Sequence, residues 1–182
     1  MQRERPEASR RRGEGSGNEA AAFLVRSAFI TEEAVYGVIL VSGMIVVASA
    51  GEASVWPVFW KVLGTVIVFW AAHVYAGTVA RHGLDDDEDL GLREAFSASL
   101  RRSLGLLLSA FIPLFILLLG ATRAIDDALA LWTALWAGVV VLAVLGFIAF
   151  RRRGAAWPMQ VVGALATAAF GVVMIGLKAF IH

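Results

Sequence analysis

A single histidine lies deep inside an apolar stretch of this chain. His73 stands at the centre of the segment FWAAHVYAGTVARHG, which runs from Phe69 to Gly83. Counted from Arg81, it lies eight residues inwards, or about 12 Å at about 1.5 Å per helical residue. Imidazole titrates near neutral pH, and ionisable groups inside membranes commonly mark ion routes or proton relays. His73 is therefore a candidate for carrying protons or cations.

Two further polar residues are expected at a similar depth. The same count places Ser42 and Thr167 level with His73, which predicts an intramembrane polar site made of these three residues. The alternative is a neutral histidine that donates a hydrogen bond to a serine, a threonine or a carbonyl. Such bonds contribute about 0.6 kcal/mol on average and serve only to join helices. The sequence leaves both interpretations open.

Five apolar runs must position these residues. They contain no Asp, Glu, Lys or Arg, in a chain that is 59% hydrophobic and 17% charged. About 20 apolar residues in a helix cross the roughly 30 Å hydrocarbon layer of a membrane. The expected fold is all-α, a polytopic bundle of five transmembrane helices over residues 34–50, 62–80, 104–120, 128–150 and 161–177.

The basic residues alternate between the two sides of this bundle. Of the 16 Lys and Arg residues, only Lys61, Arg123 and Lys178 fall on one side. Because cytoplasmic loops are enriched in Lys and Arg, the N-terminus is expected in the cytoplasm and the C-terminus outside. The other side carries Arg3, Arg5, Arg10, Arg11, Arg12, Arg26, Arg81, Arg93, Arg101, Arg102, Arg151, Arg152 and Arg153.

Composition divides the chain into two parts. Residues 1–18 are rich in Arg, Glu, Pro, Gly and Ser and predict a disordered cytoplasmic tail. Residues 19–182 form a single five-helix transmembrane domain. Before the third span, Leu92, Phe96 and Leu100 make an apolar stripe that predicts a short interfacial helix. Pro113 predicts a kink within that span.

Small residues at four-residue spacing predict where helices pack. Helices in lipid approach closely only where side chains are small. The expected helix-packing edges are Gly163, Thr167 and Gly171 on the fifth span, and Ala72, Ala76 and Ala80 on the second.

Enzymatic and cofactor motifs are weak. The acidic run from Asp85 to Asp89 fits the DDxxD spacing that holds Mg²⁺ against a diphosphate, but five acids in a row satisfy that spacing trivially. A solvated acidic loop is favoured, and a lipid-modifying membrane enzyme is the second alternative. We expect no catalytic residues, no metal site and no cofactor. The basic cluster at Arg10 to Arg12 is interrupted by acids, so no nucleic acid partner is expected.

From about Arg26 to His182 the chain resembles small integral membrane proteins of high-GC actinobacteria. The residues that carry this resemblance are EAVYGVILVSG, FWAAHVYAGTVARHG and the RRRG before the last span. It implies a multi-pass protein of a bacterial plasma membrane and brings no activity with it.

About a dozen residues resemble a family of lysosomal and bacterial potassium channels. Arg26, Thr31 and Glu32 match the spacing of its Arg-x-x-x-Phe-Ser-Asp signature, although Ile30 stands at the Phe position. Phe69, Trp70 and His73 are similar to its Phe-Trp-x-x-His-His helix, with Val74 in place of the second histidine. That family has six spans per repeat, against five here.

The predicted role is ion or small-solute permeation with His73 near the midplane. The alternative is a membrane scaffold or assembly subunit that transports nothing. The expected partners are the lipid bilayer and either further copies of the chain or another membrane protein.

Overall fold

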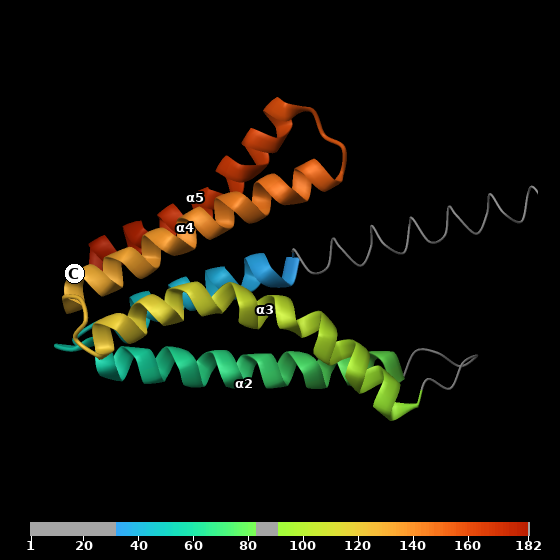
Figure 1. The fold of residues 1–182 in the computed structure, drawn as a ribbon, viewed down its shortest axis with the longest axis horizontal. Helices are drawn as coiled ribbons and strands as arrows, with labels where there is room; N and C mark the ends of the chain where they lie inside the picture. The colour runs from blue at the N-terminus through green and yellow to red at the C-terminus, as the bar shows by residue number, and fades with distance from the viewer. Residues whose placement is uncertain (1–31, 83–90, 182) are drawn as a thin grey trace, which may run out of the picture.

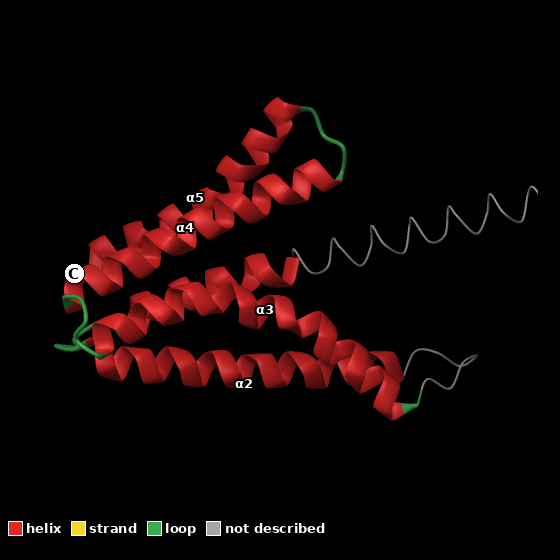
Figure 2. Ribbon diagram, viewed as in Figure 1, coloured by secondary structure: helices red, strands yellow, loops and turns green. Residues whose placement is uncertain are grey.

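The structure, a computed structural model, describes residues 32–82 and 91–181. Within these residues every regular element is a helix, as Figure 2 shows. We call residues 32–48 the first helix. The other four helices are α2 (Val55–His82), α3 (Leu92–Ala121), α4 (Asp127–Arg152) and α5 (Trp157–Ile181). The predicted tail and residues 19–31 lie outside the described residues.

Four of the helices are long and apolar enough to cross a membrane. They are α2, α3, α4 and α5, and each contains one predicted span. The all-α prediction is therefore confirmed for the described residues, and the chain is a membrane protein. The first helix is described over 17 residues, directly after the residues that the structure does not describe.

The helices meet at one end and separate at the other. Figure 1 shows the connections 49–54 and 122–126 and the C-terminal part of α5 gathered at the left. The α4–α5 turn and the start of the first helix lie at the opposite end. We call these the converging end and the open end. The helices pack mainly in sequence, α2 with α3, α3 with α4 and α4 with α5.

The first helix lies at the centre and contacts all four others. Its Tyr36 ring packs against Phe69 of α2, with the ring centroids 5.4 Å apart. A Cβ built on its Gly43 would lie 3.9 Å from Met174 Sδ of α5, and Ser49, directly after the helix, accepts a hydrogen bond from Lys178 of α5. A Cβ built on Gly37 would lie 3.1 Å from a backbone oxygen of α3, and one built on Gly138 of α4 would lie 2.8 Å from Ser42 Oγ. The described part of the first helix thus contacts all four of the other helices.

The apolar core occupies the half of the bundle near the converging end. It is built from small and branched side chains, which fit between closely packed helices. Its fully buried members are Val41, Ile45, Val55, Val58, Val62, Leu106, Ala110, Leu117, Ala130 and Ala134. The open half contains the buried acid Glu33 instead.

Helix α3 differs from the sequence prediction at its start. The predicted interfacial helix is wrong as a separate element, because α3 is continuous from Leu92 to Ala121. Leu92 and Phe96 are exposed, while Ala95 and Ser99 are buried. The apolar stripe therefore faces outwards, and the small residues pack. Figure 1 shows α3 bent near its middle, and Pro113 inside the helix removes one backbone hydrogen bond.

Two neighbouring aspartates fix the starts of two helices. The Asp126 carboxylate accepts hydrogen bonds from the backbone N–H groups of Ala128 and Leu129, at 2.9 and 3.3 Å, and so caps α4. The Asp127 carboxylate accepts from the backbone N–H of Val55 at 3.3 Å, at the first residue of α2. Asp127 therefore joins the start of α4 to the start of α2 at the converging end.

Candidate functional site

A buried carboxylate joins three helices in the open half of the bundle. Glu33 of the first helix is only 7% exposed. Its Oε1 accepts a hydrogen bond from Nε of Arg102 on α3 at 2.9 Å. The same oxygen lies 3.7 Å from Nε2 of His73 on α2. We call Glu33, His73 and Arg102 the charge cluster.

Aromatic rings hold the histidine of the cluster in place. The imidazole of His73 stacks on Phe69, one turn away on α2, with ring centroids 6.1 Å apart. Phe69 in turn packs against Tyr36 of the first helix. The imidazole is therefore held between its own helix and the first helix, on the side where Glu33 lies.

Several buried polar atoms of Glu33 and of residues close in sequence to the cluster have no hydrogen-bond partner among the described residues. They are Glu33 Oε2, Trp70 Nε1 and Ser99 Oγ. Trp70 stands three residues before His73 on α2, and Ser99 stands three residues before Arg102 on α3. Buried polar groups are nearly always satisfied by protein or by internal water. Internal water is the partner that such atoms usually have.

The cluster combines the groups that proton or ion transfer requires. A buried carboxylate is expensive unless it is paired, and Arg102 supplies the compensating charge. His73 adds an imidazole, which can accept and donate a proton. Glu33 Oε2 is left as an acceptor beside both.

The residues of this cluster are distant in sequence, since 69 positions separate Glu33 from Arg102. No family model, curated protein or solved structure matches the chain. The functional argument therefore rests on the geometry of the cluster and on the residues around it.

The structure places the three residues of the predicted polar site in different surroundings. His73 lies in the charge cluster. Ser42 lies against Gly138 of α4, and its buried hydroxyl oxygen has no partner. Thr167 donates to the Gly163 carbonyl on its own helix. Within the described residues no hydrogen bond joins any two of His73, Ser42 and Thr167.

The two predicted packing edges also differ. Gly163 and Gly171 are buried on α5. A Cβ at Gly163 would overlap the Phe150 ring, and one at Gly171 would lie 2.8 Å from Val139 Cγ2, so both glycines face α4. By contrast, Ala72, Ala76 and Ala80 are exposed on α2. This edge does not pack against another helix within the described chain.

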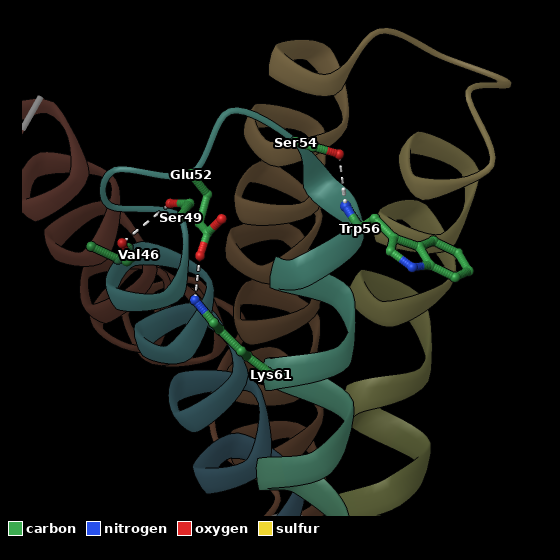
Figure 3. A network of polar contacts seen from close by, with 6 residues as sticks. All are labelled: Val46, Ser49, Glu52, Ser54, Trp56 and Lys61. Carbon is green, nitrogen blue, oxygen red and sulfur yellow. Dashed lines mark hydrogen bonds and ion pairs between the residues drawn. The ribbon is translucent and has the colours of Figure 1, made fainter.

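A second buried charge lies near the converging end. Lys178 of α5 is 3% exposed, and its Nζ donates to Ser49 Oγ at 2.8 Å. The Ser49 hydroxyl donates in turn to the Val46 carbonyl, as Figure 3 shows. Among the described residues Lys178 has no carboxylate within ion-pair distance.

Sequence analysis missed the burial of Glu33 and Lys178. The sequence pattern gave Glu33 no role in a candidate site, and it used Lys178 only to mark one side of the membrane. The spacing of residues along each helix could have indicated this burial. Lys178 follows Gly171 by seven residues, and Glu33 precedes Gly37 by four, so each shares a face with a small residue that packs.

Proposed function

We propose that the chain is a permeation protein, without a catalytic step, that moves small ions across a bacterial plasma membrane. In this proposal all five helices cross the bilayer, with the N-terminus in the cytoplasm and the C-terminus outside. The positions of the basic residues support this orientation. The first helix, which the other four surround, provides the route.

The observation that carries the proposal is the buried Glu33 between Arg102 and His73. Ionisable residues inside membrane bundles are expensive, and they commonly mark ion pathways and proton relays. A purely structural contact could be made at lower cost by neutral side chains. The unpartnered polar atoms beside Glu33 support a hydrated interior.

The proposed orientation predicts the outcome of a reporter experiment. A reporter that is active only in the cytoplasm, fused after His182, should be silent. The same reporter fused before Met1 should be active, because the basic residues concentrate on that side. Strong activity of the C-terminal fusion would place the C-terminus in the cytoplasm, and the proposal would then need one span fewer.

The charge cluster predicts the effect of neutralising Glu33. Purified protein in liposomes should conduct protons or small cations, and Glu33→Gln should reduce this flux to the background of protein-free liposomes. Glutamine has the same size and keeps an acceptor for Arg102, so the fold should survive. Glu94→Gln is the matched control, because Glu94 is an exposed acid on α3. Wild-type flux in Glu33→Gln would exclude Glu33 from the route.

Replacement of His73 tests the role of the imidazole separately. His73→Ala should abolish the pH dependence of the flux and leave thermal stability nearly unchanged, because a partly exposed ion pair contributes less than about 1 kcal/mol. A folded wild-type protein that transports no ion would instead favour the scaffold role.

A further inference from the structure

We infer that the permeant ion is the proton, and that Lys178 with Ser49 is the place where protons enter or leave the converging end. This inference rests on the proposed function, because it names the ion that the same route conducts. It starts from three polar residues, namely Glu33 and Ser42 in the first helix and Ser49 directly after it. Each is buried, and each faces a different neighbour.

The surroundings of Lys178 lack a counter-charge among the described residues. Glu52, in the connection after the first helix, pairs with Lys61 on α2, as Figure 3 shows. Asp126 and Asp127 accept from backbone N–H groups. Lys178 is left with one neutral partner, Ser49 Oγ.

An ammonium group in such a place is costly, because burial removes its water and only helix carbonyl ends offset the charge. A neutral amine needs only the single hydrogen bond that Ser49 supplies. The cost of burying the ammonium form therefore allows the Lys178 side chain to change between its charged and neutral forms by gaining and losing a proton. A lysine serving only as an anchor would be expected beside a carboxylate.

The same residues disfavour metal cations. A cation such as Na⁺ or K⁺ must exchange its water for a shell of several oxygen ligands. The described residues contain no group of three or more His, Cys, Asp or Glu, so such a shell would have to come from backbone carbonyls and hydroxyls. Lys178 in its charged form and Arg102 would also repel a metal ion. A proton needs only one acceptor at each step, with water between.

The proton balance of the route is simple. The Lys178 amine takes a proton from the outer solution and becomes an ammonium, which then releases one proton to internal water. Water beside the unpartnered hydroxyl of Ser42 transfers a proton towards the Glu33 carboxylate. Glu33, with His73 beside it, then releases a proton at the open end. One proton enters, one leaves, and every group returns to its starting form.

The polar residues of the proposed route are too far apart for direct proton transfer, so water must lie between them. Seven residues separate Ser49 from Ser42, and nine separate Ser42 from Glu33, which correspond to about 10 Å and about 14 Å of helix rise. These distances exceed any direct hydrogen bond. The buried unpartnered atoms at Ser42, Glu33 and Ser99 are the places where such water would bind.

Substitution of Lys178 tests the inference in liposomes that contain the full chain and a pH-sensitive dye. A valinomycin-set potassium potential drives the protons. Lys178→Arg keeps a cationic donor for Ser49 but cannot lose its proton, so the proton flux should fall to the background of protein-free liposomes. Lys178→Met, which removes the buried charge, should also lose the flux and should fold. Lys61→Met is the control, because Lys61 is an exposed lysine on the same side.

Each result has a separate meaning. Wild-type proton flux in folded Lys178→Arg and Lys178→Met would overturn the role of Lys178. Sodium or potassium flux through the wild type without proton flux would overturn the choice of ion and leave permeation intact. The absence of every ion flux would reject the proposed function, and this inference with it.

Discussion

Replacing Arg102 with leucine is expected to destabilise the purified protein by about 3 kcal/mol. The change leaves the Glu33 carboxylate buried with only His73 at 3.7 Å. Removal of one partner from a buried ion pair typically costs about 3 to 5 kcal/mol, and the lower end applies because the Arg102 side chain is 36% exposed. Thermal unfolding in detergent should show a fall in melting temperature of about 6 to 12 °C.

A double substitution separates the lost pair from lost packing. If the unpaired carboxylate is the cause, then Glu33→Gln in the same chain should restore most of the stability, because it removes the charge that Arg102 compensates. The matched control is Arg101→Leu, since Arg101 is exposed on the same turn of α3. Equal losses in Arg101→Leu and Arg102→Leu would contradict the buried pair.

Gly146→Ala is expected to destabilise the α4–α5 hairpin by about 3 kcal/mol, the upper part of the usual range for overpacking. A Cβ at this position would overlap Thr167 Oγ1 and lie 2.5 Å from the Gly163 carbonyl oxygen. A flexible side chain could move away, but the backbone oxygen of Gly163 can move only if α5 shifts. The measurement is again the melting temperature in detergent.

Two variants accompany this prediction. Gly176→Ala on α5 meets no atom within 4 Å and should be neutral or stabilising by up to about 1 kcal/mol, through helix propensity. Thr167→Ala combined with Gly146→Ala removes the hydroxyl overlap but leaves the backbone contact, so it should rescue only part of the loss. If Gly146→Ala and Gly176→Ala have the same stability, the close approach of α4 and α5 is not present in detergent.

The helices could be predicted because each depends on local composition. Charge-free runs of sufficient length identified the places of α2 to α5. The continuity of α3 was missed because its first turns alternate exposed apolar and buried small residues. A stripe at Leu92 and Phe96 has the right period for packing, but the period does not say which face the neighbouring helix covers.

The candidate site could be predicted only in part. His73 was found because an ionisable residue inside an apolar run is conspicuous in any window of sequence. Glu33 and Arg102 lie at the ends of their runs, where charged residues are ordinary. Their contact depends on how the first helix, α2 and α3 are arranged together, which residue spacing within one helix does not determine.

The central position of the first helix has a consequence for synthesis. This helix is made before all four of its neighbours, and its contacts are with residues that the ribosome adds later. Glu33 meets Arg102 after 69 further positions, and Ser49 meets Lys178 after 129. At about 5 to 20 residues per second, the second interval is roughly 6 to 26 s. During that time the polar side chains of the first helix must be shielded by lipid headgroups, water or the insertion machinery. The centre of the bundle is thus the first part made and the last part to be enclosed.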